Sequence, residues 1–416
     1  MKLHIGIDDT DSKKGLCTTY LGVVLKDRLK GFAEVSEIRL VRLNPNIPWK
    51  TRGNGAVALA VETSDPSRVV EEALRAVEKY SAMEEEGTNP GLVVLRGEVT
   101  SELVSFYYKA LRDIATVEEA EALAERHYCE VYKFNNGRGI IGALAAIGAD
   151  LFTHTYELIA YRRQENWGTE RGIEPRSVFE MDRATYPDTF NNVDKETSRI
   201  LITPRSPCPV LFGIRARRWE VLECAKAMLR LHEPIERYAV FKTNQGTDAH
   251  LVPRKISEVK PFTSAIVKGA VIEAPKTLIG GHVVFTLAEN NSAIDCAAFE
   301  PTGSFRDVVK HLMVGDVVEA YGGVKETKRL TVNLEKLRVV ELKEGYEAKN
   351  PVCPQCKKRM ESAGKNQGFR CRVCKTTSPV KEFIPVKRKL KTGLYAVPTR
   401  AMRHLSMPLI ETGGRP

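Results

Sequence analysis

The sequence predicts a multidomain α+β protein with two α+β domains of the same strand order, a small β-barrel and a C-terminal cysteine-rich ribbon. Three observations lead to this prediction. Strand-like and helix-like patterns follow the order β-α-β-β-α-β twice, five short strand-like segments come next, and two CxxC pairs come last. A chain of 416 residues is long enough for two to four domains with cores of their own.

The first 126 residues carry the first α+β pattern. Polar and apolar residues alternate in residues 2–7, residues 92–95 form a short apolar run, and apolar residues recur at helical spacing in the helix-like segments. We expect a ferredoxin-like sheet with helices on one side, followed by two further helices at 101–111 and 116–127. The predicted strands are residues 2–7, 35–43, 55–61 and 92–95, and the predicted helices are residues 19–29 and 66–80.

The same order recurs in residues 127–258, which we expect to form a second ferredoxin-like domain. Residues 163–199 are polar and weakly periodic, so we expect a long ordered loop or an insert there. The predicted strands are residues 130–134, 156–162, 200–203 with 210–215, and 238–242, and the predicted helices are residues 138–147 and 220–231.

Residues 259–343 change to short strands separated by Gly, Asn and Pro turns. One helical stretch, residues 305–313, falls between the third and the fourth of five strands, which matches an OB-type barrel. Another small β-barrel is the alternative. The five strand candidates are residues 265–274, 282–287, 293–299, 316–322 and 337–342.

Two CxxC pairs lie within residues 350–380. Their spacing places four thiolates on two turns, which suits tetrahedral zinc, and four sulfur ligands leave no open position for a catalytic water. We therefore expect a structural zinc ribbon. The other five of the nine cysteines are scattered, so no disulfide framework is expected. The four predicted ligands are Cys353, Cys356, Cys371 and Cys374.

The end of the chain is strongly basic. Residues 351–416 hold 15 Lys and Arg but three Glu, whereas the rest of the chain is close to neutral. Such a segment attracts polyanions. The ribbon, the barrel before it and a basic C-terminal extension at 381–416 favour a nucleic-acid platform over a solvated tail. With no membrane-spanning run and no signal-peptide pattern, we expect a cytoplasmic protein.

Three carboxylates, those of Asp8, Asp9 and Asp11, cluster directly after the first predicted strand. Like charges this close need a cation or strong hydrogen bonds. Mg²⁺ held together with ATP phosphates is a common solution. The alternative is an Asp-rich turn of purely structural importance, and the absence of GxxxxGK[ST] shows that the segment is no P-loop.

A helix is predicted to begin just after the carboxylates. Gly15, Thr18 and Thr19 lie where its N-terminal N–H groups are free to bind a phosphate. Either threonine suits an N-cap, a nucleophile or a phosphate ligand.

Three further segments have the composition of ligand-binding loops, with Gly for close approach and Arg or Asn as donors. Each alone is more often a turn, but three of them in two domains of matched topology favour a shared cleft. They are the stretch with Lys50, Arg52, Gly53, Asn54 and Gly55, the stretch with Asn136, Gly137, Arg138 and Gly139, and residues 243–250.

These motifs together resemble one known family. The runs IGIDDTDS, RLNPNIPWKTRGNGA, NNGRGIIGA and TNQGTDAH, with an OB module and a terminal zinc ribbon, closely resemble the archaeal tRNA(Ile) 2-agmatinylcytidine synthetases. The resemblance covers nearly the whole chain in the same domain order. IDDTDS with KTRGNGA is its most specific part, because many proteins share the OB and ribbon patterns.

The resemblance implies a reaction. The family uses ATP to attach agmatine to C2 of the wobble cytidine in the CAU anticodon of an isoleucine tRNA, which then decodes AUA. It implies an atypical kinase domain at the N-terminus that phosphorylates the cytidine O2 and also a threonine of its own, matching Thr18. The agmatine amine then displaces the activated oxygen. We expect Asp8, Asp9 and Asp11 to bind Mg²⁺ and act in catalysis, and Arg52 to contact phosphate.

Two other functions remain open. A non-catalytic single-strand-binding protein also combines an OB barrel with a zinc ribbon, but it leaves IDDTDS and the glycine loops unexplained. An ATP-dependent RNA modifier that uses another amine, such as lysine, or another base is the second alternative.

Overall fold

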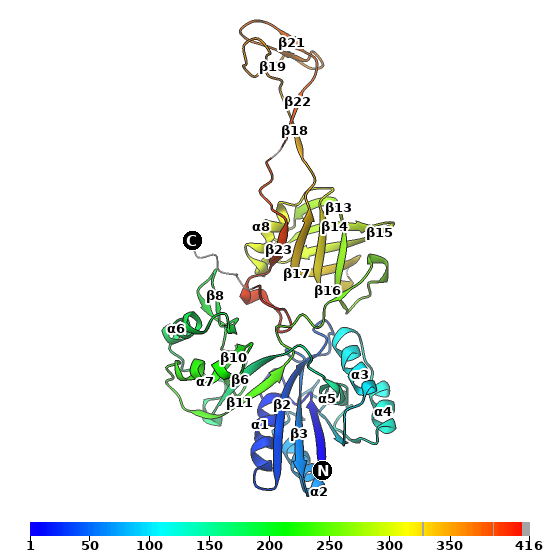
Figure 1. Ribbon diagram of the computed structural model, residues 1–416, viewed down its shortest axis with the longest axis vertical. Coiled ribbons are helices and arrows are strands. Elements are labelled where there is room, and N and C mark those ends of the chain that lie inside the picture. The colour runs from blue at the N-terminus through cyan, green and yellow to red at the C-terminus, as the bar shows by residue number, and fades with distance from the viewer. Residues whose placement is uncertain (327, 386, 410–416) are drawn as a thin grey trace.

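The computed structural model describes residues 1–409 except 327 and 386. One large sheet with its helices forms the lower body of Figure 1, a β-barrel stands above it, and a small ribbon lies at the far end of a two-stranded stalk. In the described part of the chain, no helix combines the length and the apolar character needed to cross a membrane.

The first predicted α+β unit is confirmed. Its strands lie in the order β4-β1-β3-β2, which is the ferredoxin-like arrangement, and β1 pairs antiparallel with both β3 and β4. The elements are β1 (Lys2–Asp8), α1 (Thr18–Leu29), β2 (Ala33–Arg42), β3 (Gly55–Thr63), α2 (Pro66–Tyr80) and β4 (Gly91–Arg96).

The second unit has the same topology, in the order β11-β6-β10-β7. Its β11 pairs in parallel with β2, so the two units share a single nine-stranded sheet. The elements are β6 (Thr155–Arg162), α6 (Pro175–Thr185), β7 (Thr189–Phe190), β10 (Val210–Ala216), α7 (Glu220–Ala227) and β11 (Ile235–Thr243), with a small hairpin of β8 (Val193–Asp194) and β9 (Arg199–Ile200).

The prediction of which elements open the second unit was wrong. Strand β5 (Glu130–Lys133) pairs with β4, and helix α5 (Gly139–Gly148) packs on β1, so both pack with the strands of the first unit. Glycine permits this packing: a Cβ on Gly6 would lie 2.0 Å from the carbonyl oxygen of Ala143. The first helix of the second unit is α6, inside the predicted loop at 163–199. It escaped detection because it buries Val178 and Met181 among polar residues.

Helices cover both faces of the sheet, where the sequence predicted one. The side chains of Leu3, Ile5 and Ile7 on β1 all point to the face covered by α1 and α2. The opposite face packs against α3 (Ser101–Arg112), α4 (Val117–Arg126) and α5 in the first unit, and against α6 and α7 in the second. The period of two in a strand predicts a buried face, but it cannot show that the other face is also covered.

The predicted OB-type barrel is confirmed. Five strands close in the order β13-β14-β15-β17-β16, and β16 pairs back with β13. The helix between the third and the fourth strand is where the sequence placed it. The elements are β13 (Ser264–Thr277), β14 (Val283–Glu289), β15 (Ser292–Ala298), α8 (Phe305–Lys310), β16 (Val317–Glu326) and β17 (Leu330–Glu341), with β12 (Val252–Pro253) on the edge.

The chain leaves the barrel for the ribbon and then returns to it. The stalk pairs β18 (Tyr346–Lys349) with β22 (Glu382–Pro385), and the ribbon contains β19 (Glu361–Ser362), β20 (Phe369–Arg370) and β21 (Thr377–Ser378). On the return, an Arg388 nitrogen lies 2.6 Å from the buried carboxylate of Asp316. Strand β23 (Gly393–Ala396) then joins β17.

The segment predicted as a basic C-terminal extension is therefore largely integrated into the fold. We call residues 398–407 the C-terminal strap. It runs from the barrel across the large sheet (Figure 1), and Leu405 is buried in the core beside α3 and α5. The last part of the predicted extension, residues 410–416, lies outside the described residues.

Candidate active site

The three clustered carboxylates lie at the end of β1 but point to different partners. Asp9 has a positive φ of 56°, which turns the chain sharply after the buried strand. Its carboxylate lies 2.9 Å from an Arg138 nitrogen, and Asp11 accepts from Nε of Arg52 at 2.7 Å. Asp8 has no Lys, Arg or His partner within 4 Å among the described residues. The three therefore do not form one compact carboxylate cluster, and Asp8 is the one left for a cation.

The surroundings of Asp8 disfavour its charge. Burial, followed by the neighbouring charge of Asp9, raises the pKa of Asp8 to about 8. Burial also raises the pKa of Asp9, against the opposing effect of Arg138. Helix α5 presses on the Asp8 side chain so closely that a Cβ on Gly142 would lie 1.8 Å from Oδ2. A carboxylate with a raised pKa at the wall of a cavity is typical of a functional site.

Helix α1 begins beside this cluster. Its N-cap is Cys17, so neither threonine caps it, and Thr18 and Thr19 form its first turn. The hydroxyl of Thr10 donates to Oγ1 of Thr18 at 3.0 Å, and both residues are buried. Thr18 is held at the wall of the cavity by this bond.

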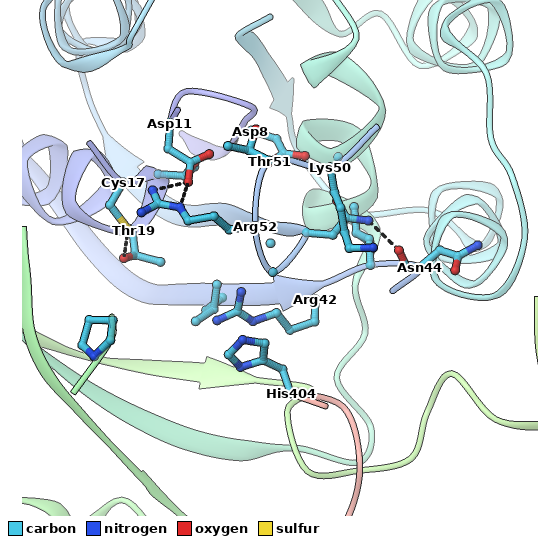
Figure 2. Close-up of a pocket in the computed structure, with 18 of the residues that line it drawn as sticks. Asp8, Asp11, Cys17, Thr19, Arg42, Asn44, Lys50, Thr51, Arg52 and His404 are labelled. Carbon is cyan, nitrogen blue, oxygen red and sulfur yellow. Dashed lines mark hydrogen bonds and ion pairs between the residues drawn. The ribbon is translucent and has the colours of Figure 1, made fainter. Parts of the chain in front are cut away.

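The loop at 50–55 folds over the cavity (Figure 2). Lys50 donates to the backbone oxygens of Pro45 and Ile47, at 2.6 Å and 3.0 Å. Arg52 binds Asp11, the Leu16 carbonyl at 2.6 Å and the Ser206 hydroxyl at 3.1 Å. All three guanidinium nitrogens of Arg52 thus have protein acceptors. In this structure Arg52 clamps two loops at the cavity wall, and its predicted contact with phosphate stays a prediction.

One cavity of about 500 Å³ lies between the two α+β units and the C-terminal strap. Gly15 lies outside its lining because the chain turns back through paired bonds between Ser12 and Gly15. Asn136 and Gly137 are also outside: the Asn136 side chain accepts from the Arg138 amide at 3.0 Å and shapes the turn before α5. The predicted residues that do line the cavity are Asp8, Asp9, Asp11, Thr18, Thr19, Lys50, Arg52, Gly53, Asn54, Gly55, Arg138 and Gly139.

Many of the cavity residues were not predicted from the sequence, and four of them have ionisable side chains that bear on the chemistry of the site. Arg42 ends β2, Glu157 lies on β6, Arg215 lies on β10, and His404 comes from the strap. Arg42, Glu157 and Arg215 have one feature in common that could have identified them. Each is a charged residue with a buried apolar neighbour in its strand. Such charges in a buried strand face mark a site or an ion pair. No local pattern marks His404, because only the fold brings it here.

The loop at 243–250 joins parts of the protein and does not line the cavity. The Asn244 side chain accepts from the Arg42 amide and donates to the Arg42 carbonyl, both at 2.8 Å. His250 lies 3.1 Å from the carboxylate of Glu335 on the barrel. The side chains of Asn244 and His250 therefore form hydrogen bonds that hold β11, β2 and the barrel together.

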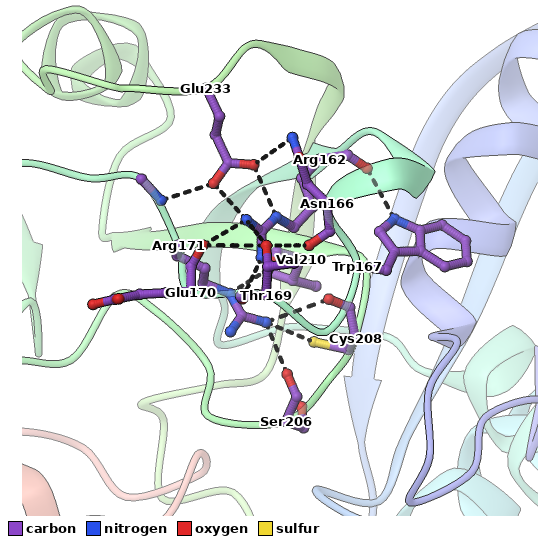
Figure 3. A network of polar contacts seen from close by, with 11 residues as sticks. Arg162, Asn166, Trp167, Thr169, Glu170, Arg171, Ser206, Cys208, Val210 and Glu233 are labelled. Carbon is purple, nitrogen blue, oxygen red and sulfur yellow. Dashed lines mark hydrogen bonds and ion pairs between the residues drawn. The ribbon is translucent and has the colours of Figure 1, made fainter.

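A buried network supports the far wall of the cavity (Figure 3). Arg162 is 1% exposed and forms a 2.7 Å ion pair with Glu233. Arg171 donates to the carbonyl oxygens of Val210 and Ser206, each at 2.8 Å. This network fixes the segment that carries two cavity-lining residues, Ser206 and Cys208.

The ribbon cysteines form a second site. Their four sulfur atoms all lie within 4.8 Å of one another. A tetrahedral zinc with Zn–S bonds of about 2.3 Å requires sulfur separations of this order. The ribbon core is otherwise small, with Met360 and Phe369 packed against the cysteines.

Comparison with known proteins identifies the family. Three family models match: the TiaS TCKD domain at residues 4–136, the TiaS FLD domain at 137–250 and the TiaS C-terminal zinc ribbon domain at 350–390. The isoleucine-tRNA 2-agmatinylcytidine synthetase TiaS of Archaeoglobus fulgidus is 43% identical over 415 residues, covering 99% of this chain and 97% of that protein. This chain belongs to the TiaS family. The TiaS of Methanosarcina mazei is 44% identical over 98% of this chain and 96% of its own length.

Solved structures of the TiaS family have the same fold. A complex of TiaS with its isoleucine tRNA and ATP matches with a TM-score of 0.92 and 43% identity, covering all of this chain and 98% of that one. A complex of TiaS with the same tRNA, AMPCPP and agmatine matches with a TM-score of 0.89 and 41% identity over the same shares. The first two family models meet at residues 136 and 137, whereas the sequence predicted a boundary at 126 and 127.

The four cysteines of the ribbon suit a structural zinc ion, and the ribbon is expected to depend on that ion. Metal analysis is expected to find about one zinc per chain, because a single site of four cysteines is present among the described residues. A chelator is expected to unfold the ribbon and leave the sheet and barrel folded, since their cores do not include the cysteines. Zinc content and circular dichroism before and after chelation test this. A zinc-free protein with an intact ribbon contradicts it.

Proposed function

We propose that this chain is an ATP-dependent tRNA(Ile) 2-agmatinylcytidine synthetase, which joins agmatine to the wobble cytidine of the CAU anticodon so that the tRNA decodes AUA. The proposal is carried by one observation. Across a chain that matches TiaS proteins from end to end, the cavity brings Asp8 and Thr18 together with the cationic side chains of Arg42 and Arg215. We place the reaction in the cytoplasm.

The chemistry requires an activated oxygen. A cytosine carbonyl oxygen is a poor leaving group, and transfer of a phosphoryl group from ATP to O2 makes it a good one. The primary amine of agmatine then attacks C2, the C2–O2 bond breaks, and the oxygen leaves with the phosphate. This kinase-like first step is supported by the kind of site present, which offers cationic side chains, hydroxyl groups and a carboxylate for Mg²⁺ to a phosphoryl group.

Thr18 and the acidic residues at the end of β1 have different roles in this reaction. Asp8 is the carboxylate without an arginine partner among the described residues, so we assign it as the ligand for Mg²⁺ accompanying ATP, with Asp9 beside it. A bound Mg²⁺ would neutralise phosphate charge during transfer. Asp11 holds Arg52 and thereby the loop at 50–55. Thr18 presents a hydroxyl to the cavity, where we propose that it accepts a phosphoryl group.

Binding of the RNA falls to the rest of the chain. The wobble base must leave the anticodon stack to reach the cavity, at a cost of about a few kcal/mol. The barrel and the basic ribbon follow the large sheet along the long axis of the molecule (Figure 1), where contacts with the tRNA body offset this cost.

Mass spectrometry of the modified nucleoside tests the proposal. The protein would be incubated with a CAU isoleucine tRNA, ATP, Mg²⁺ and agmatine, with lysine in a parallel reaction. A mass gain on the wobble cytidine with agmatine alone is expected. A gain with lysine would replace the amine and keep the activation chemistry. No gain with either, together with intact tRNA binding, would favour a binding protein instead.

A further inference from the structure

The C-terminal strap is anchored to three parts of the molecule. Arg400 forms a 2.9 Å ion pair with Asp194 in the second α+β unit. Leu405 is buried in the core of the first unit. The Ser406 hydroxyl donates to the carboxylate of Glu335 on the barrel. The strap follows directly on the chain that returns from the ribbon, so it is a fixed wall and not a loose tail.

Between these anchors the strap places His404 in the reaction cavity (Figure 2). Its Nδ1 lies 2.7 Å from an Nη2 nitrogen of Arg215 and 3.0 Å from Oε1 of Gln245. The same Gln245 oxygen accepts from Nε of Arg42 at 3.3 Å. Nδ1 of His404 thus accepts from Arg215, and the Gln245 oxygen lies beside it as a second acceptor. The imidazole also lies close to Arg42, because a Cβ on Gly53 would meet both Nη1 of Arg42 and Nε2 of His404.

His404 is a neutral hydrogen-bond acceptor in this arrangement. His404 is exposed to the cavity, and the positive charge of Arg42, ahead of desolvation by the cavity wall and the charge of Arg215, holds the pKa of His404 well below its ordinary value. A guanidinium group can only donate, so the contact with Arg215 requires Nδ1 to be unprotonated. The imidazole therefore orients the guanidinium of Arg215 without adding or removing charge.

The glycines of the 50–55 loop make room for this group. A Cβ on Gly53 would lie 2.7 Å from Nη1 of Arg42 and 3.1 Å from Nε2 of His404. A Cβ on Gly55 would lie 2.8 Å from the same arginine nitrogen. From the sequence, these glycines are expected to contact a ligand through their backbone. In the structure, the absence of a Cβ at both positions leaves room for the side chains of Arg42 and His404.

The two arginines carry more positive charge than their protein partners neutralise. Glu157 lies 3.3 Å from Nε of Arg215 and is the nearest carboxylate to it among the described residues. Within the same part of the chain, no carboxylate lies within 4 Å of Arg42. Two guanidinium groups beside one carboxylate leave a surplus charge facing the cavity. Planar guanidinium donors bind carboxylate and phosphate groups in a bidentate manner, and a phosphate group is the anion that the proposed reaction brings here.

We propose that the C-terminal strap completes the reaction pocket, and that His404 is a positioning residue which holds Arg215 beside Arg42 as a binding site for a phosphate group. The inference rests on the proposed function and deepens it by assigning a phosphate subsite to residues outside the IDDTDS cluster. The phosphate belongs either to ATP or to the RNA backbone at the wobble nucleotide.

Two variants of His404 test the inference. His404→Ala removes the acceptor, and His404→Gln keeps an acceptor oxygen for Arg215. The KM for ATP and the KM for tRNA would be measured separately. In His404→Ala one of them is expected to rise about tenfold to thirtyfold, in line with the loss of a charge-assisted hydrogen bond, with recovery in His404→Gln. A rise for ATP identifies its phosphate as the ligand, and a rise for tRNA identifies the backbone phosphate. No rise in either, or equal losses in both variants, overturns the inference.

A double-mutant cycle tests whether His404 acts through Arg215. His404→Ala is expected to have little further effect in an Arg215→Gln background, because the group that it orients is already gone. Additive losses would contradict this. Met407→Ala is the matched control, since its side chain lies on the strap but is exposed to solvent. Equal melting temperatures for all variants exclude misfolding.

The outcome can be separated from that of the proposed function. Product formation by the unmodified protein is measured first, and its failure concerns the function alone. Equilibrium binding of ATP, and of tRNA, to the His404 variants then still reports on the phosphate site. A dissociation constant unchanged for both ligands overturns the site even if no reaction is observed.

Discussion

Asp8→Asn is expected to reduce product formation by about a thousandfold or more and, in the protein without bound cation, to increase stability above pH 4. Asn has nearly the same shape but cannot supply the charge that a cation and a phosphoryl group require. Product formation is measured on the wobble nucleoside by mass spectrometry, and tRNA binding by filter retention. Binding is expected to persist, because Asp8 lies in the cavity and not in the basic ribbon.

The stability effect follows from the direction of the pKa change. The pKa of Asp8 is about 8 in the folded protein and 3.8 in the unfolded chain. Protonated Asp8 therefore contributes stability that is fully present below pH 4 and is lost as the pH rises through 8. Asn does not ionise, so the variant does not lose this stability as the pH rises. It is expected to match the melting temperature of the natural protein near pH 4 and to melt at a higher temperature near pH 8.5. A lower melting temperature at pH 8.5 would contradict the raised pKa.

Asp11→Asn is the matched control for this measurement. Asp11 also belongs to the IDDTDS cluster, but it forms an ion pair with Arg52, which is partly buried. Removing one partner of such a pair leaves the other charge unmatched. We therefore expect Asp11→Asn to lower the melting temperature at pH 8.5, where Asp8→Asn raises it.

Thr18→Ala is expected to abolish or severely reduce modification while tRNA binding survives. The Thr18 hydroxyl lies at the first turn of α1, lines the cavity and is held by the Thr10 hydroxyl at 3.0 Å. If this oxygen accepts a phosphoryl group during the reaction, alanine at this position has no oxygen to accept it. Product formation and tRNA binding are measured as for Asp8→Asn, and phosphopeptide analysis reports whether the residue is phosphorylated.

Thr18→Ser separates the chemistry from the packing. Serine keeps the hydroxyl and removes only a methyl group, so most of the activity is expected to remain. Thr10→Ala removes the hydrogen-bond partner and is expected to cause a smaller loss than Thr18→Ala. Full activity in Thr18→Ala would remove Thr18 from the mechanism, whereas equal losses in the alanine and serine variants would indicate a packing role.

Local patterns predicted much of the architecture. Alternating polar and apolar residues identified β1, a short apolar run identified β4, and turn residues with short strands identified the barrel, because buried, paired strands select short apolar or alternating segments. Local spacing was weakest where packing uses small residues. Helix α5 was recognised as a helix, but its packing on β1 was not predicted, because glycines such as Gly6 and Gly142 permit a close approach without showing which element approaches.

The sequence by itself determined the first ferredoxin-like pattern, the barrel, the four zinc ligands and the carboxylates after β1, because each depends on residues close together in the chain. Only the tertiary structure decided that β2 and β11 join the two units into one sheet, and that Arg42, Arg215 and His404 meet in one cavity. His404 lies 189 residues from its hydrogen-bond partner Arg215. No local pattern in the sequence predicts such a contact, because the contact arises from the path of the chain through the ribbon and back.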